Sequence, residues 1–292
     1  MIDVRPSLLP PLENSFAPAA PWNRAYRALV ARDPSARPLA VVVSSTGGAV
    51  SRHDTRVLGA GHPASALTLT YVERLVKFLL WQKGGSRVRI AGADEITAEL
   101  ARIYSAAGAR AFDHRFMGET TYREPFVVET AAMAALPEGR VASLPVGRHL
   151  DGCRIGFDLG GSDRKAAAVI DGKVVFSEEI TWDPYFQKDP AYHLEGVHDS
   201  LRRAAAHLPR VDAIGGSAAG VYVNNEVRVA SLFRGVPPDL FDRHVRRMFF
   251  TLQERWGGVP FEVANDGEVT ALAGSMSLGD CAVLGIAMGT SL

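Results

Sequence analysis

Cysteine is scarce in this chain of 292 residues, and neither sign of charge is in excess. The two cysteines, Cys153 and Cys281, are too few for a disulfide framework and lack the spacing of a metal site. Each stands at the start of an apolar segment, so we expect both to be buried and the protein to reside in the reducing cytoplasm. With 32 basic and 32 acidic residues, the chain has no net field that would attract nucleic acid or an anionic membrane surface.

Long hydrophobic runs are missing as well. No apolar stretch approaches the ~20 residues that a membrane-spanning helix requires, and residues 1–6 show neither a basic leader nor a cleavage signal. We therefore expect neither a membrane nor a nucleic acid as partner. A small molecule, or an anion held by local backbone amides, suits this composition better, and a homo-oligomer is left open.

The first half of the chain, residues 1–150, alternates strands with helices in a way that is typical of α/β proteins. Residues 7–21 are rich in proline and are expected to form an extended lead-in. Apolar periodicity predicts strands at 39–44 and 87–91 and helices at 65–83 and 94–107. The histidines of this half occur singly, so we assign residues 1–150 no chemical role.

The second half, residues 151–292, has a clearer pattern of three strands followed by alternating helices and strands. Strands are predicted at 153–158, 165–170, 173–180, 211–215, 261–264 and 282–288, helices at 190–208, 241–256 and 266–278, and an outlying hairpin at 221–232. Asn224-Asn225 is interpreted as the plain turn of that hairpin.

Polar clusters follow three of these strands. They are Asp158 to Ser162, which contains two adjacent glycines, Asn265 to Glu268 at a strand-to-helix junction, and Gly289 to Ser291. Bare glycines let backbone amides face a polyphosphate, whereas a side chain would block its approach. Because ligands gather at the carboxyl ends of strands in layered α/β sheets, the three clusters predict one binding site.

In this order, the motifs resemble those of the ROK family of sugar kinases and repressors, which belongs to the actin-like ATPase superfamily of hexokinase and the Hsp70 chaperones. The resemblance covers Arg154 to Leu292 and includes the glycine-rich segment Gly215 to Gly220. It implies an α/β fold in which an actin-like, ribonuclease H-like lobe with a mixed five-stranded sheet follows an additional α/β region. It also implies ATP-dependent phosphorylation of a hexose or amino sugar hydroxyl, as in glucokinases, with ATP and Mg²⁺ as cofactors.

The resemblance further implies roles for individual residues. Asp266 would be the general base on the sugar hydroxyl, and Asp158 would hold Mg²⁺ through water. Contacts to the sugar would come from Asn265, Gly220, Ser217 and Glu268. The nucleotide phosphates would be held by Gly160, Gly161, Ser162, Lys165, Gly289 and Thr290. Each role has a simpler alternative: Asp266 could be only a helix cap, Asp158 could only shape a turn, and Lys165 could point to solvent.

Three features depart from the family pattern. Asp163 places a second carboxylate beside the expected phosphates, which is repulsive unless Arg164, Lys165 or the metal offsets it. Gly267-Glu268 replaces the Ala-Asn of the family. The chain also stops at Leu292, inside the second phosphate motif, so we expect a fragment that lacks the second lobe. The alternative is that residues 1–150 supply part of that lobe, with residues 41–48 facing the nucleotide.

Two other functions compete with the kinase. The first is a non-catalytic regulator that senses sugar on the same scaffold, because a fold does not determine a function. Residues 1–150 show no basic recognition helix, which argues against direct DNA binding. The second is a degenerate kinase that acts in protein assembly, an interpretation favoured by Asp163 and by the position of the last residue.

Overall fold

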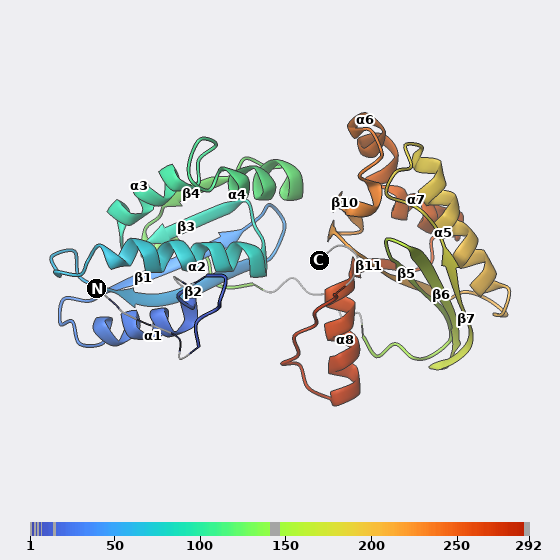
Figure 1. The fold of residues 1–292 in the computed structure, drawn as a ribbon, viewed down its shortest axis with the longest axis horizontal. Helices are drawn as coiled ribbons and strands as arrows, with labels where there is room; N and C mark the ends of the chain where they lie inside the picture. Colours follow the sequence, from blue (N-terminus) through green and yellow to red (C-terminus); the bar gives the residue numbers. More distant parts are fainter. Residues whose placement is uncertain are drawn as a thin grey trace. The chain divides into compact units, whose positions relative to one another are not determined.

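The chain divides into two compact units, Met1–Leu144 and Pro145–Leu292. The computed structural model, shown as a ribbon in Figure 1, describes residues 2, 4, 6, 8–13, 16–140 and 147–288. Each unit has its own β-sheet and its own hydrophobic core. Within the described part of the chain, no helix combines the length and the apolar character needed to span a bilayer.

The first unit is built on a four-stranded sheet with the order β2-β1-β3-β4. Its strands are β1 (Arg37–Ser44), β2 (Val50–Val57), β3 (Arg87–Ala91) and β4 (Val127–Thr130). β1 is antiparallel to β2 and β3, whereas β3 and β4 are parallel. The helical segments are α1 (Ala19–Val30), α2 (Leu67–Lys83), α3 (Asp94–Ile103), α4 (Ala111–Arg115), the π-helical η1 (Phe116–Tyr122) and the short η2 (Met133–Ala135).

The four predicted elements of this unit are confirmed, although α3 ends at Ile103 rather than at residue 107, while α1, β2, α4, η1, β4 and η2 were not predicted. The extended lead-in expected at residues 7–21 was predicted too long, because α1 already begins at Ala19. This helix buries Trp22, Tyr26 and Val30 at helical spacing. Pro21 is tolerated because the first N–H groups of a helix have no intrahelical acceptor. β2 was not predicted because its sequence is polar. A polar sequence is tolerated there because β2 is an edge strand, which pairs with β1 alone in the described sheet.

The second unit is built on a five-stranded mixed sheet with the order β11-β8-β5-β6-β7. Its strands are β5 (Cys153–Leu159), β6 (Asp163–Ile170), β7 (Lys173–Thr181), β8 (Ala213–Ala218) and β11 (Phe261–Asn265). β5, β6 and β7 are antiparallel, while β8 lies parallel to both β5 and β11. Three antiparallel strands followed by two parallel ones form a mixed five-stranded sheet, so the predicted α/β class and the predicted sheet are confirmed.

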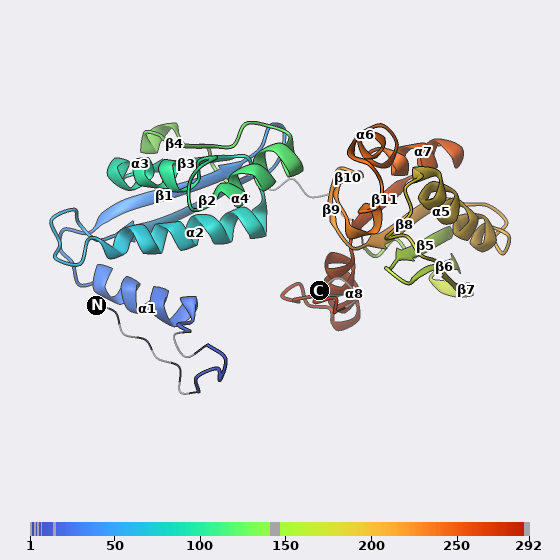
Figure 2. The same cartoon turned by 45° about the horizontal axis from the view of Figure 1, so that its top comes forward.

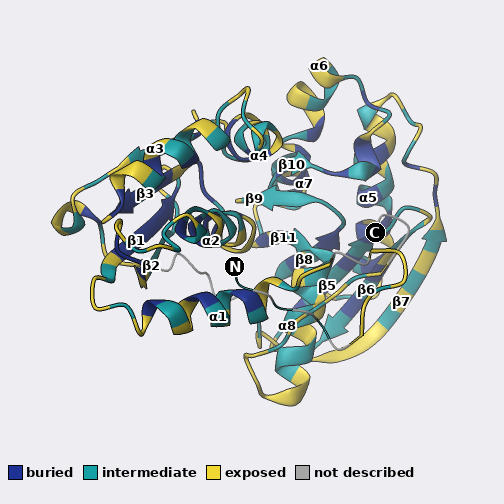
Figure 3. Cartoon of the chain, turned by 60° about the vertical axis from the view of Figure 1, so that its left-hand side comes forward, coloured by how far each residue is buried: buried dark blue, intermediate teal, exposed yellow. Residues whose placement is uncertain are grey.

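Helices cover the two faces of this sheet unequally. Ile155, Phe157 and Leu159 alternate along β5 and point into a core formed with α5 (Pro190–Ala205) and α7 (Met248–Arg255). α8 (Asp266–Leu278) lies by the opposite face (Figures 1 and 2). No residue of α8, which the structure describes throughout, is buried, as the teal and yellow ribbon of Figure 3 shows.

Three predictions for this unit are wrong. The helix expected at 241–256 is divided into α6 (Pro238–Leu240), a π-helical segment η4 (Phe241–Val245) and α7, because the Arg246 carbonyl accepts from Val227 N instead of continuing the helix. Residues 282–288 form no strand. Cys153 is buried as expected, but Cys281 is exposed, since the strand that would have covered it does not form.

The hairpin of β9 (Val221–Val223) and β10 (Glu226–Val229) lies beside β11, which is an edge strand of the sheet among the described residues. Asn224 and Asn225 at its turn have φ values of 50° and 62°, a region that asparagine tolerates well. The Asn225 side chain donates to Phe261 O (2.8 Å) and accepts from Val263 N (2.8 Å). The predicted hairpin turn is confirmed, and Asn225 is in addition a brace that satisfies two backbone groups of β11.

Replacing Asn225 should destabilise the second unit more than replacing its neighbour. Asn225→Ala removes two hydrogen bonds to β11, whereas Asn224→Ala imposes a similar left-handed backbone strain without that loss. We expect Asn225→Ala to lower the free energy of unfolding by about 1–3 kcal/mol more than Asn224→Ala, measured by urea denaturation. Equal losses in the two variants would show that Asn225 does not act as a brace.

Candidate functional site

A cavity of about 840 Å³ opens at the carboxyl end of β5. The predicted site residues that line it are Asp158, Gly160, Gly161, Ser162, Lys165, Ser217, Gly220, Asn265 and Asp266. Glu268 is not among the lining residues, and Gly289 and Thr290 lie outside the described residues. The structure thus brings predicted residues from three separate segments to one cavity, while their individual roles stay predictions.

The register of the parallel strands produces this convergence. Asp158 pairs with Ser217 across β5 and β8, and Ala218 pairs with Asn265 across β8 and β11. Parallel strands end at the same edge of a sheet, so the residues that follow them meet there. Ser217, which is 8% exposed, donates a hydrogen bond from its hydroxyl to Asp158. Ser217 therefore positions Asp158, and little of its side chain is left for a ligand.

The glycine turn leaves the amides of two of its three predicted phosphate-binding residues without an acceptor among the described atoms. The Gly160 N–H donates to Asp163 O (2.9 Å) and closes the β5–β6 hairpin, so it is not available to a phosphate. In the part of the chain that the structure describes, the N–H groups of Gly161 and Ser162 have no acceptor. A Cβ atom on Gly161 would collide with the Tyr185 hydroxyl, so this position requires glycine.

Asp163 is neutralised by Lys165. The Lys165 ammonium donates to Asp163 and lies 4.0 Å from Asp158 Oδ2. The bond to Lys165 is the main reason why the pKa of Asp163 is lowered, and the same bond raises the pKa of Lys165. Lys165 thus points toward the cavity rather than away from it, but much of its charge is already offset.

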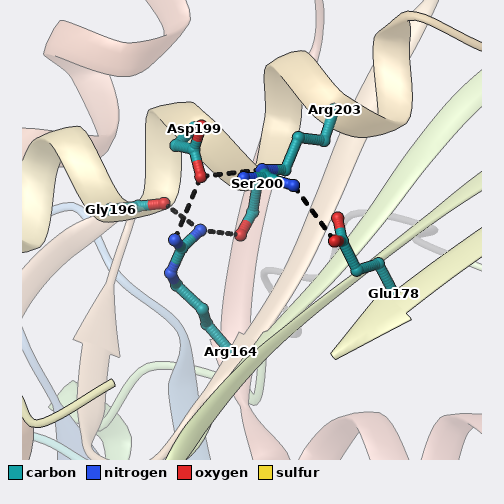
Figure 4. A network of polar contacts seen from close by, with 6 residues as sticks. All are labelled: Arg164, Glu178, Gly196, Asp199, Ser200 and Arg203. Atoms are coloured by element: carbon teal, nitrogen blue, oxygen red, sulfur yellow. Dashed lines mark hydrogen bonds and ion pairs between the residues drawn. The ribbon is translucent and has the colours of Figure 1, made fainter. Parts of the chain in front are cut away.

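Arg164 does not take part in offsetting Asp163. Its guanidinium turns to the other face of the sheet, where it donates to Gly196 O (2.7 Å) and Asp199 (3.0 Å) of α5 (Figure 4). Arg203 extends this network from Asp199 to Glu178. The network fastens α5 to β6 and β7, so its role is structural.

Asn265, rather than Asp266, caps α8. Its side-chain oxygen accepts from Gly267 N (2.9 Å), and Glu268 accepts from Asn265 N (3.3 Å), which completes a capping box. The Asn265 amide nitrogen also donates to Gly220 O (2.9 Å). Asn265 therefore retains one N–H for a ligand, and Glu268 serves the cap instead of the cavity.

The Asp266 carboxylate is free of the capping role. It stands in the first turn of α8, accepts from Gly267 N (3.0 Å), and forms no ion pair with any described residue. Its negative charge reaches Tyr222, whose pKa is raised first by burial and then by Asp266. An unpaired carboxylate that faces a cavity is suited to accept a proton from a bound hydroxyl.

A single carboxylate, Asp158, is available for a metal ion. Its side chain is 40% exposed and keeps one oxygen that Ser217 does not occupy. The described residues contain no group of three or more His, Cys, Asp or Glu side chains that would hold a metal by themselves. The donor set fits Mg²⁺, which keeps several waters and combines one or two carboxylates with substrate phosphates.

Tyr185, a lining residue that sequence reasoning missed, belongs to the segment of residues 182–187, which we call the aromatic arm. The Trp182 indole donates to Gly160 O (2.8 Å), and Trp182 N donates to Ser162 O (3.0 Å). Tyr185 lines the cavity. The signal in the sequence was the density of aromatic residues directly after β7, which no motif of the predicted site includes.

His193 holds the aromatic arm in place through hydrogen bonds to backbone carbonyls. It is fully buried, and its Nε2 lies 3.1 Å from Pro184 O and 3.0 Å from Leu232 O. Both partners are acceptors, so Nε2 carries the proton, and Nδ1 has no partner among the described atoms. Burial lowers the pKa of His193, since the charged form is costly in a dry environment.

Comparisons with known proteins give partial likenesses only. No protein-family model and no curated protein matches the chain. Partly similar solved structures are a ROK hexokinase from Thermus thermophilus (21% identity, TM-score 0.32), a glucokinase from Parabacteroides distasonis (17%, 0.34) and a ROK-family transcriptional regulator described as a homologue of the E. coli MLC protein (20%, 0.29).

These matches cover 44%, 42% and 62% of this chain. The chain spans 38%, 33% and 39% of the three solved chains, which is less than half of each. The hexokinase and the regulator are described as members of the family that the motifs resemble. At these identities and TM-scores, the likeness assigns neither an activity nor a substrate to this chain.

Lowering the pH should loosen the second unit through His193. Its folded pKa lies below the unfolded value of about 6.5, so its contribution to stability is complete above that pH and is lost as the pH falls below it. We expect the unfolding free energy of the wild type to fall by at most about 1.4 kcal/mol per pH unit from this group. His193→Gln, which keeps a donor, should flatten the dependence between about pH 7 and pH 5 in urea titrations. Parallel curves for the two proteins would contradict this prediction.

Proposed function

We propose that the second unit binds a nucleoside triphosphate with Mg²⁺ and transfers its terminal phosphoryl group to a hydroxyl of a hexose or amino sugar. One observation carries the proposal. The Asp266 carboxylate, which Asn265 relieves of capping, shares one cavity with the unpaired amides of Gly161 and Ser162. A proton acceptor and a phosphate cradle on the same cavity are the two parts that phosphoryl transfer to an alcohol requires.

At the phosphate end, the N–H groups of Gly161 and Ser162 would donate to phosphate oxygens. Preorganised amides are suited to charge that develops on those oxygens during transfer. Lys165 would add a partly offset positive charge, and Asp158, oriented by Ser217, would hold the metal. Asp158 and Asp163 add negative charge beside the turn, so the chain alone would not neutralise the phosphates. Bound Mg²⁺ would supply the missing positive charge.

At the sugar end, Asp266 would accept the proton of the attacking hydroxyl. The sugar oxygen forms a bond to the terminal phosphorus while the bond from that phosphorus to the leaving oxygen breaks, which releases the nucleoside diphosphate. Asn265 would contribute its remaining N–H to a neighbouring sugar hydroxyl. Gly220 would contribute by position, because its carbonyl holds the Asn265 amide in place.

A sugar-sensing regulator without catalysis is the second candidate. The charges of the cavity favour it, since Asp158, Asp163 and Asp266 line the site and Lys165 is the only cation among the described lining residues. Three carboxylates oppose a polyphosphate unless a metal compensates them, whereas they hydrogen-bond readily to sugar hydroxyls. Binding of sugar without phosphoryl transfer would fit that balance.

The kinase proposal predicts a separation of turnover from binding at Asp266. Asp266→Asn keeps the size and the contact to Gly267 N but removes the proton acceptor. We expect a loss of at least about 100-fold in kcat, with sugar affinity changed by less than about threefold. The measurement is ADP release from ATP and Mg²⁺ over a panel of hexoses and amino sugars, with sugar affinity followed by calorimetry.

Glu268→Gln is the matched control for this experiment. It also removes an acidic group from the first turn of α8, but glutamine preserves the capping box and the position does not line the cavity. Its turnover should stay within about threefold of the wild type. Wild-type turnover in Asp266→Asn would falsify the base assignment, whereas thermal stabilisation by a sugar without ADP release in the wild type would select the regulator.

A further inference from the structure

The aromatic arm is held rigidly against the glycine turn. Trp182 binds two carbonyls of that turn, and His193 ties the arm to Leu232. Beyond it, Gly235 packs so closely that a Cβ atom there would lie 2.7 Å from Gln187 O and 2.9 Å from Tyr185 O. The arm thus has contacts at its start, its middle and its end, which preorganises the side chain that it presents to the cavity.

Tyr185 is that side chain. Its hydroxyl lies directly against Gly161, in the space that a side chain at this position would fill. The two amides without acceptors, at Gly161 and Ser162, belong to the same turn. A phosphate that those amides bind would therefore have the Tyr185 hydroxyl beside it, and a hydroxyl can donate to an anionic oxygen.

Arg234 holds the ring of Tyr185. The Cζ atom of its guanidinium lies 4.0 Å from the centroid of the Tyr185 ring and 5.2 Å from that of Phe186. Within the described residues it has no carboxylate partner. Stacking of a guanidinium on an aromatic ring restrains the ring and favours one orientation of its hydroxyl.

The charges of the cavity explain why a neutral donor is useful at this place. Lys165 is the only cation among the described lining residues, and Asp163 already accepts from it. A further carboxylate would repel the ligand, and the turn itself supplies only two free amides. A tyrosine hydroxyl adds a hydrogen bond to a phosphate without adding a negative charge.

We propose that Tyr185 contacts the ligand as a phosphate donor at the glycine turn, and that Arg234 is a positioning residue that acts through Tyr185. The proposal deepens the function proposed above and rests on it. It assigns the aromatic arm to the phosphate end of the cavity rather than to the sugar end. It also explains why Gly161 must lack a side chain.

Calorimetric titration with inorganic tripolyphosphate and Mg²⁺ tests the proposal, because this probe contains phosphates without nucleoside or sugar. Tyr185→Phe keeps the ring and its stacking on Arg234, and should weaken binding about tenfold, as for a lost hydrogen bond to a charged group. Arg234→Gln should weaken binding about threefold in the wild type and should have no further effect in Tyr185→Phe. If Arg234 had only a structural role, the effects of the two substitutions on binding would add.

Tyr192→Phe is the matched control. The Tyr192 hydroxyl accepts from Asp183 N in the aromatic arm, so its loss loosens the arm without removing a group from the cavity. This variant should bind tripolyphosphate within about twofold of the wild type. Binding by Tyr185→Phe equal to the wild type, or equal losses in Tyr185→Phe and Tyr192→Phe, would overturn the role of Tyr185. Failure of the wild type to bind tripolyphosphate would instead overturn the phosphate site itself, and with it both proposals.

Discussion

The parallel register of β5, β8 and β11 is the constraint on which the site depends. It places Asp158 beside Ser217 and Ala218 beside Asn265, so that a glycine turn, a glycine-rich segment and a helix start meet at one edge of the sheet. The outer edge of this arrangement is fixed by Asn225, which satisfies β11 where no further strand pairs with it. A shift of β11 by one residue would turn the Asn265 side chain to the opposite face of the sheet, because successive side chains of a strand alternate between faces, and it would move the start of α8 with it.

Some polar residues of the site form structural hydrogen bonds, so that neighbouring groups remain available for chemistry. Asn265 and Glu268 form the capping box of α8, which leaves the Asp266 carboxylate with a contact to Gly267 N and with no ion pair to a described residue. Ser217 orients Asp158, and Lys165 offsets Asp163. Ser217 and Asn265 thus stabilise the local structure, while Asp158 and Asp266 remain available to a ligand. Residues of the same type in the same motif therefore have different roles, which only the hydrogen bonds distinguish.

Much of this could be predicted from the sequence. α8 has its predicted bounds because its cap residues and its final glycine are local signals, and the strands of the second unit follow from apolar runs. What could not be predicted depends on partners distant in the chain. The Gly160 amide closes a hairpin, Asn225 braces a strand 36 residues away, and His193 supports the aromatic arm through Leu232. The strand expected at 282–288 is wrong, since an apolar run does not reveal whether a neighbouring strand is available to pair with it.

A crystal structure with Mg²⁺, a non-hydrolysable ATP analogue and a hexose would test the central claim most directly. We expect the terminal phosphate to accept hydrogen bonds from the N–H groups of Gly161 and Ser162. A sugar hydroxyl should then lie between that phosphate and the Asp266 carboxylate, within about 3 Å of the carboxylate. A phosphate bound elsewhere, or a sugar hydroxyl remote from Asp266 while both ligands occupy the protein, would contradict the proposal that one cavity joins the two ends of the reaction.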